Sequence, residues 1–226
     1  MGLSHSPKIV TTGLVGYWDA GSSKSYPGSG TTWYDISGKG NHGTLINGPT
    51  YSEGAISFDA VDDYVSCPAS SNYAFGTGNF TISVWVYPQS FSGYTHMVAF
   101  PNKNTFVIKA ARTGDGVAGS IYFYSTAFNT SDSTPGWTLT LNTWQQVVLK
   151  RESSVAYAFL NSELKGSKSG FNNDFSTAPQ LNIHNSFAGA NEFSQCKMSN
   201  IKVYNRALSS QEIKQNFNAL RGRFGI

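Results

Sequence analysis

The stretch Asn79–Pro88, NFTISVWVYP, is the clearest guide to the fold. Its β-branched and aromatic residues occupy both faces of an extended chain, which is typical of a central strand covered on both sides. Similar short segments lie on either side of it, separated by turn residues such as Gly, Pro, Asn and Asp. They are Ala55–Asp59, Asp63–Cys67, Tyr94–Phe100, Asn104–Ala110, Gly119–Ser125, Thr143–Lys150, Ser154–Asn161, Gln180–His184 and Ser199–Asn205.

The order and spacing of these segments predict an all-β fold. Many short strands with frequent turns favour an antiparallel sandwich or barrel over parallel βαβ units. The three residues Arg151–Ser153 separate two strand segments, and we interpret them as a hairpin loop.

The composition fits one folded domain. The 226 residues include 14% aromatic and 13% charged residues, and a disordered chain shows the opposite balance. The net charge is +3 with scattered Lys and Arg, so we expect no nucleic-acid partner. No apolar run is long enough to enter a membrane, and the N-terminus shows no signal-peptide core.

One helix is expected, over residues 209–221. Ser209 and Glu212 form a capping-box pattern, and an apolar stripe continues to Leu220. Gly222 is expected to end the helix, which we place against the edge of the sandwich. We divide the chain into an N-terminal arm, residues 1–12, and one domain, residues 13–226; the arm either docks on something or is a frayed end.

The segment Trp33–Leu45, WYDISGKGNHGTL, predicts a structured loop with an aromatic anchor. Gly38, Gly40 and Gly43 allow positive φ, and Asp35 with Ser37 can cap the exposed amides of a turn. A second interpretation is a calcium site, because hard cations prefer carboxylate and carbonyl oxygens in tight loops. Asp35 would then combine with a carboxylate from Asp59, Asp62 or Asp63.

The two cysteines, Cys67 and Cys196, have no metal-type spacing. They allow one long-range disulfide, but we favour two half-buried free thiols.

Paired carboxylates for glycan cleavage are missing from the strand segments. The acidic residues cluster instead at Asp59, Asp62 and Asp63, where capping a turn is the simplest role. The histidines show no zinc spacing, and no nucleophile elbow or phosphate-binding loop is found. We therefore name no catalytic residue and expect the chain not to be an enzyme.

Aromatic residues are the main candidates for binding. If Phe123 faces the core, Tyr122 and Tyr124 point outward together. They would form a sugar-stacking platform, an interface with another subunit, or a face covered by a loop. Trp137 follows Pro135 and Gly136, and of the five tryptophans it is the one expected to be exposed; the others belong mostly to the core.

Five stretches of the chain together resemble laminin-G-like, concanavalin-A-like domains of bacterial surface proteins and tailed phages. They are GLVGYWDA, WYDISGKGNHGTLINGPTY, AISFDAVDDYV, FTISVWVYP and IKVYNRALSSQEIKQNFNALRGRFGI. The resemblance extends from about Gly13 to Gly222, and SYPGSGTTWYDISG and RGRFGI are most similar to the phage branch. Ala60 replaces a usual glycine, and Ile183-His184 replaces a frequent Ile-Gly pair.

The resemblance implies a two-sheet jelly-roll sandwich and, in many relatives, one calcium ion at a loop edge. We expect a non-enzymatic phage virion component, made in the host cytoplasm, that decorates the capsid or tail or binds host-surface glycans. Its partners would be other virion proteins or host-surface polysaccharide, and it would form a homo-oligomer. The alternatives are a bacterial carbohydrate-binding module or lectin, or a cryptic glycan hydrolase or lyase.

Overall fold

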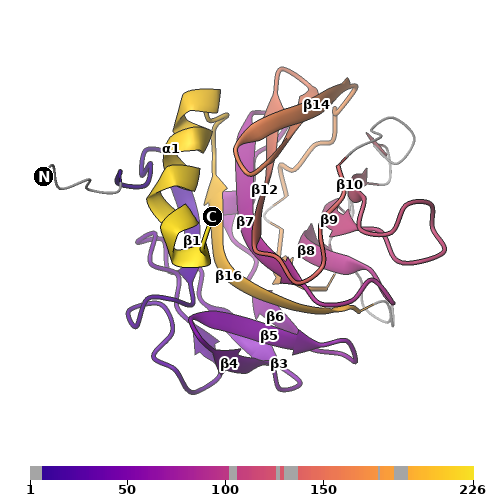
Figure 1. Ribbon diagram of the computed structural model, residues 1–226. Coiled ribbons are helices and arrows are strands. Elements are labelled where there is room, and N and C mark those ends of the chain that lie inside the picture. Colours follow the sequence, from indigo (N-terminus) through magenta and orange to yellow (C-terminus); the bar gives the residue numbers. More distant parts are fainter. Residues whose placement is uncertain (1–6, 102–105, 126–127, 130–136, 178, 186–192) are drawn as a thin grey trace, which may run out of the picture.

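The computed structural model describes residues 7–101, 106–125, 128–129, 137–177, 179–185 and 193–226. Within these residues, two antiparallel sheets of eight strands each stack on one another, and a single α-helix lies outside them (Figure 1). The predicted all-β, two-sheet jelly-roll sandwich with one short C-terminal helix is confirmed.

The first sheet, sheet I, has β7, β12 and β16 at its centre. Its spatial order is β14-β13-β12-β7-β16-β5-β4, and β1 also pairs with β16. The bounds are β1 (Leu14–Asp19), β4 (Thr50–Ser52), β5 (Ala55–Asp59), β7 (Phe80–Pro88), β12 (Gln145–Glu152), β13 (Val155–Leu160), β14 (Glu163–Ser169) and β16 (Gln195–Tyr204).

The second sheet, sheet II, runs in the order β11-β10-β9-β8-β15-β6-β3-β2. Its strands are β2 (Thr32–Trp33), β3 (Gly43–Ile46), β6 (Tyr64–Cys67), β8 (Thr95–Phe100), β9 (Phe106–Ala110), β10 (Ile121–Ser125), β11 (Phe128–Asn129) and β15 (Leu181–Ile183). A 3₁₀ turn, η1 (Ser71–Tyr73), follows β6 and buries Tyr73.

The helix α1 (Ser210–Leu220) begins with the predicted capping box. The backbone N–H of Glu212 donates to Ser209 Oγ at 3.2 Å, and Ser209 N–H donates to Glu212 Oε2 at 2.9 Å. The prediction that Gly222 ends the helix is wrong. The chain continues as a 3₁₀ turn, η2 (Arg221–Phe224), and leaves it at Gly225, where φ is 73°.

Strand β7 is buried on both faces, as its sequence predicts. On its outer face Trp85 stacks under Phe217 at 5.6 Å and under Phe224 at 4.2 Å between ring centroids. The helix and η2 therefore cover the outer face of the central strands, not the sheet edge as expected. Four side chains of β7 enter the core between the sheets: Phe80, Ile82, Val84 and Val86.

Residues 8–10, near the start of the described chain, pack on helix α1 and on β16. Val10 N–H donates to Asn216 Oδ1 at 2.8 Å, and its carbonyl accepts from the Tyr204 hydroxyl at 2.9 Å. Gln215 Nε2 donates to the Lys8 carbonyl at 2.7 Å. These contacts tie residues 8–10 to the outer surface of sheet I.

The hairpin between β12 and β13 turns later than predicted. Arg151 and Glu152 belong to β12, and the turn falls at Ser153 and Ser154, where φ is 50° and 62°. The prediction of a loop at Arg151–Ser153 is wrong, because the Arg151 side chain is buried and its hydrogen bonds hold the residue in β12.

Arg151 is fully buried between the sheets. Its guanidinium donates to the carbonyls of Gly78 at 2.7 Å, Asn173 at 2.6 Å and Gly76 at 2.8 Å. Burial lowers the pKa of Arg151 to about 10. The cation thus joins the segment after η1 to the segment after β14. Its Cζ lies 4.8–5.3 Å from the ring centroids of Phe80, Phe171 and Phe175.

Both cysteines are free thiols. Cys67 and Cys196 are fully buried, not half-buried as expected, and burial raises the pKa of each thiol. Cys196 Sγ lies 3.5 Å from Nδ1 of His184, whose pKa burial lowers to about 4.

Another buried basic residue, Lys202, lies on the outer face of β16. Its Nζ donates to Asn200 Oδ1 and lies 5.0 Å from the centroid of the Tyr17 ring. Asp19 nearby accepts from the Tyr17 hydroxyl at 3.0 Å and from Arg223 Nη2 at 3.2 Å. Burial lowers the pKa of Lys202 to about 7, with Arg223 acting in the same direction and Asp19 against it.

Candidate functional site

The tyrosines of β10 point out of the sandwich, as predicted. Phe123 is fully buried and contacts Trp137, with 6.0 Å between ring centroids. Because neighbouring side chains on a strand point to opposite faces, Tyr122 and Tyr124 lie on the outer face of sheet II, where both are half-buried.

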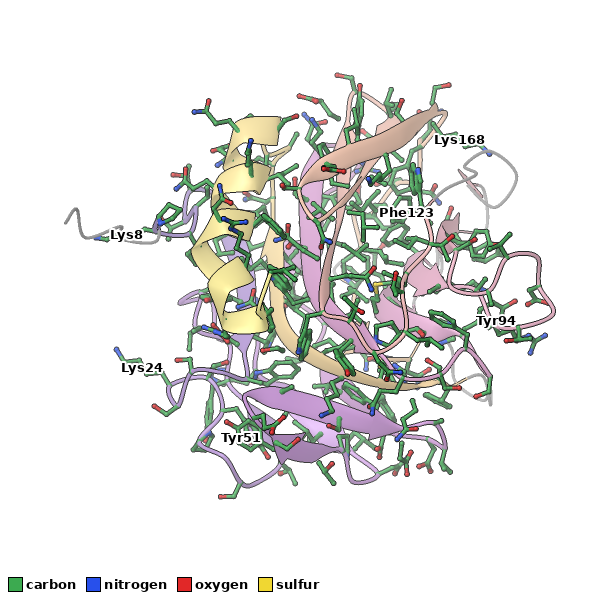
Figure 2. All side chains as sticks on the ribbon, in the orientation of Figure 1. Lys8, Lys24, Tyr51, Tyr94, Phe123 and Lys168 are labelled. Carbon is green, nitrogen blue, oxygen red and sulfur yellow. The ribbon has the colours of Figure 1, made fainter. Side chains whose placement is uncertain are left out.

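Lys109 of β9 stands beside these tyrosines. It pairs with Tyr122 across the two strands, and its Nζ lies 5.6 Å from the centroid of the Tyr124 ring. The same Nζ lies 3.6 Å from the centroid of the Tyr94 ring, which also has Arg112 Cζ at 5.1 Å. We call Tyr94, Lys109, Arg112, Tyr122 and Tyr124 the tyrosine face; Figure 2 shows Tyr94 on the side of the molecule away from α1.

Asp115 fixes the tyrosine face. Its carboxylate accepts from the Tyr94 hydroxyl and from Arg112 Nε at 3.1 Å, and its backbone carbonyl accepts from the Tyr122 hydroxyl at 3.3 Å. The Tyr94 hydrogen bond, followed by the charge of Arg112, lowers the pKa of Asp115. This carboxylate is ionised at neutral pH and positions Tyr94 and Arg112, whereas the backbone carbonyl of Asp115 positions Tyr122.

The outer face of sheet II continues as amides and hydroxyls. Leu181 and Ile183 enter the core, so Asn182 between them points outward and lies beside Ser66 of β6. Gln180 Nε2 donates to Ser66 Oγ at 2.7 Å and to Asn182 Oδ1 at 3.1 Å. These groups do not adjoin the tyrosine rings, because the register places Val107 and Ala99, both fully buried, between Tyr124 and Asn182. Asn182 is itself only 6% exposed. The surface suited to the apolar C–H faces of sugars is therefore that of the tyrosine face.

His96 of β8 pairs with Lys109, in the row that also contains Tyr122, and it is buried. Burial, followed by the charges of His184 and Lys109, lowers the pKa of His96 well below its ordinary value. The imidazole is therefore neutral at physiological pH.

The loop after Trp33 has the predicted aromatic anchor. Trp33 is fully buried, and Gly38 and Gly40 have φ of 84° and 73°. Gly43 has a different role from the predicted one: its φ is not positive, but a Cβ there would lie 2.6 Å from Val65. Gly43 is thus required for close packing of β3 on β6.

Both carboxylate oxygens of Asp35 are hydrogen-bonded within this loop. Oδ1 accepts from the amides of Tyr17 and Ser37 at 2.8 Å. Oδ2 accepts from Ser37 Oγ and the Asn41 amide at 2.9 Å. Asp35 therefore has the turn-capping role that the sequence favours.

Asp62 and Asp63 directly precede β6, which begins at Tyr64. Asp35 lies near the other end of this strand, because its charge contributes to raising the pKa of Cys67. Asp63 accepts from the Asp59 amide at 3.1 Å, and burial raises its pKa to about 6. The structure thus does not bring the proposed calcium ligands together. Among the described residues no group of three or more His, Cys, Asp or Glu side chains could hold a metal ion.

The predicted exposure of Trp137 is wrong. Only 4% of its surface is exposed, since it packs on Phe123 and lies against Gly166, where an added Cβ would come within 3.0 Å of its ring. Trp144, expected in the core, is half-buried instead. Pro and Gly before Trp137 indicated a turn, but they carried no information on where the ring would point.

The sequence matches a known family over residues 59–214, described as Laminin_G_3, concanavalin A-like lectin/glucanases superfamily. No curated protein sequence matches the chain. Among the described residues no helix has the length and apolar character needed to cross a membrane.

Solved structures with the same fold include glycan-processing proteins. Trypanosoma rangeli sialidase in complex with the inhibitor DANA matches with a TM-score of 0.70 and 18% identity, over 95% of this chain and 35% of the sialidase. Domain 4 of AbnA, a GH43 extracellular arabinanase from Geobacillus stearothermophilus in complex with arabinotriose, gives 0.66 and 13%, over 90% of this chain and 97% of the domain. The binding domain of Paraclostridial Mosquitocidal Protein 1 gives 0.68 and 15%, over 92% of this chain and 52% of that chain.

The likeness to sialidases contradicts the expectation that the chain is not an enzyme. That expectation rested on missing acid pairs along the strands, whereas the fold itself recurs in enzymes that act on glycans. At this level of identity the likeness shows the fold, and the chain spans about one third of the sialidase length.

Proposed function

Because this chain belongs to the concanavalin A-like lectin/glucanase superfamily, we propose that it is a glycan-binding module and that the tyrosine face is its binding surface. Tyr122 and Tyr124 would stack on sugar rings, and Lys109, which lies beside both, would donate to the hydroxyl groups. Helix α1 covers the outer face of sheet I around Trp85, whereas the half-buried tyrosines of sheet II leave ring surface for a polysaccharide.

One observation carries this proposal. A single domain with the same fold, matched over 97% of its length, is solved in complex with arabinotriose. The half-buried tyrosines add the chemistry that such a ligand needs, because their rings are already held by Asp115 and Lys109 and lose little freedom on binding.

A glycan array with the purified protein tests the proposal, followed by titration of the best ligand into Tyr122→Ala/Tyr124→Ala. Each stacking contact contributes roughly 0.5–1.5 kcal/mol, so the double variant should bind about 10- to 100-fold more weakly. Tyr34→Ala is the matched control, because Tyr34 is an exposed tyrosine outside the tyrosine face. Equal affinity of the double variant and the native protein would refute the assignment of this face.

The sequence resemblance supports a narrower proposal on biological setting. The module would decorate or extend a phage capsid or tail as a homo-oligomer, contact other virion proteins and bind host-surface polysaccharide. A calcium cofactor would need ligands other than the set of Asp35, Asp62 and Asp63, which the structure does not bring together. Mass spectrometry of purified virions tests the location, and repeating the array with calcium and then with a chelator tests the cofactor. Absence of the chain from virions would remove the phage setting and leave the glycan proposal intact.

Glycan cleavage is a second candidate, favoured by the shared fold with sialidases. Asp63 is the described carboxyl group suited to a general acid, because burial raises its pKa to about 6 and Asp59 lies beside it. Release of sugar from sialosides or polysaccharides that Asp63→Asn abolishes would support cleavage. Turnover unchanged in Asp63→Asn would exclude Asp63 from that role.

A further inference from the structure

A small cavity lies on sheet I, the sheet opposite the tyrosine face. It has a volume of about 130 Å³ and is formed by the β4–β5 turn, β7, β16 and the residue before β12. Its lining residues define the Trp144 pocket: Ser52, Glu53, Ala55, Tyr87, Trp144 and Lys197. Figure 2 shows Tyr51, the neighbour of Ser52, near the bottom of the view and well separated from Tyr94.

Two aromatic rings form one wall of the pocket. Tyr87 and Trp144 have ring centroids 5.5 Å apart with an interplanar angle of 55°, and both are half-buried. Phe224 of η2 supports the Trp144 ring, with 4.7 Å between centroids. The rings therefore have fixed positions and still expose part of their surface.

Polar groups of opposite charge stand on the other sides. Lys197 pairs with Tyr87 across the strands, and its Nζ lies 5.8 Å from the centroid of the Tyr87 ring. Glu53 is exposed in the turn between β4 and β5. In the part of the chain that the structure describes, neither side chain forms an ion pair.

The turn that carries Glu53 is held in one conformation. Glu53 has φ of 53°, a left-handed conformation that costs a non-glycine residue free energy. The next residue, Gly54, has φ of 76°, and its carbonyl accepts from Ser199 Oγ at 2.6 Å. Such strain persists only where the surroundings fix the backbone, so the turn fixes the point from which the Glu53 side chain extends at the pocket mouth.

We propose that the Trp144 pocket binds one neutral sugar ring, such as the terminal residue of a glycan chain. The rings of Tyr87 and Trp144 would contact its C–H face, Glu53 would accept from hydroxyl groups, and Lys197 would donate to them. The pairing of one acid with one base favours an uncharged, polyhydroxylated ligand. The volume is well below the roughly 300–1,000 Å³ of pockets for drug-sized molecules, so the pocket would hold no more than one ring while the rest of the chain stays in solvent.

This site is independent of the tyrosine face, and it goes beyond the proposed function by giving the module two glycan sites on opposite sheets. Saturation-transfer NMR with methyl glycosides of neutral hexoses and pentoses is the test, with free sialic acid as the charged comparison. We expect at least one neutral glycoside to bind with roughly millimolar affinity, the range common for a single small ring. Glu53→Gln, which keeps the shape of the side chain, should weaken it about tenfold, and Trp144→Ala should abolish it.

The variants separate the two proposals. Binding of the glycoside that persists in Tyr122→Ala/Tyr124→Ala but is lost in Trp144→Ala supports the pocket. Binding that is lost only in the tyrosine variant overturns the pocket and leaves the proposed function standing. Binding of sialic acid alone, no binding of any neutral glycoside, or equal affinity in Glu53→Gln would also overturn it. Because Glu53 is exposed, Glu53→Gln gives an answer even if Trp144→Ala fails to fold.

Discussion

Lys202 makes the stability of this protein depend on pH in the neutral to alkaline range. Its ammonium is fully buried, and its ordinary pKa of 10.5 falls to about 7 in the folded state, chiefly because of burial. Between these two values the unfolded chain carries the proton and the folded chain does not. The free energy of unfolding therefore rises with pH from about 7 to about 10.5, and the destabilisation is complete below pH 7.

The size of the effect follows from the shift. One pKa unit corresponds to about 1.4 kcal/mol, so the full destabilisation from Lys202 at low pH is roughly 5 kcal/mol. The variant Lys202→Met keeps a chain of similar length without the charge. We expect it to be more stable than the native protein by about this amount near pH 6, with the difference falling by about 1.4 kcal/mol per pH unit above 7.

Urea unfolding of both proteins between about pH 6 and pH 10 measures this difference. The thiols Cys67 and Cys196 and the buried tyrosines also titrate differently on unfolding, but they are present in both proteins and cancel. Lys197→Met is the matched control on the same strand, because Lys197 is only half-buried. A stability difference for Lys202→Met that stays constant across the pH range would refute the reasoning.

Three further predictions concern stability. Arg151→Met should lower the free energy of unfolding by roughly 3–5 kcal/mol, because the carbonyls of Gly76, Gly78 and Asn173 lose a fully buried donor. Denaturant unfolding checks this, and a loss under about 1 kcal/mol would contradict it. Ser209→Ala should lower the free energy of unfolding by about 1 kcal/mol, because the helix loses its N-cap, whereas Ser209→Asp should lower it little. Denaturant unfolding measures both, and equal losses for the two variants would argue against capping. Gly43→Ala should cost roughly 1–3 kcal/mol through its clash with Val65, and an unchanged melting temperature would show that β3 moves freely.

Much of the fold could be predicted from local sequence patterns. Strand β7 could be predicted because apolar residues on both faces require cover on both faces. On the outer face α1 provides this cover, since its Phe217 stacks on Trp85. The start of α1 could be predicted because the capping box depends only on residues four positions apart or fewer. The same holds for Asp35, whose hydrogen bonds to Ser37 and Asn41 stay within one loop.

Partners far apart in the sequence explain what the patterns missed. From the sequence alone Arg151 resembles a turn residue. Its acceptors, the carbonyls of Gly76, Gly78 and Asn173, are far from it in the sequence, so no local pattern indicates that it is buried. Strand β14 (Glu163–Ser169) has no apolar alternation, and it forms because the β13–β14 turn sets its register on β13. The Trp144 pocket requires β4, β7, β16 and η2 to meet, and no segment alone indicates it.

The two ends of the described chain lie on the same side of the sandwich. Residues 8–10 are bound to α1, and Arg223 near the other end is bound to Asp19 of β1. A tag or support attached at either end would therefore hold the molecule by its sheet I side and present the tyrosine face to the solution. Attachment at the C-terminus would also bring the support close to Phe224 and hence to Trp144, which would shield the proposed site at the Trp144 pocket and leave the tyrosine face accessible.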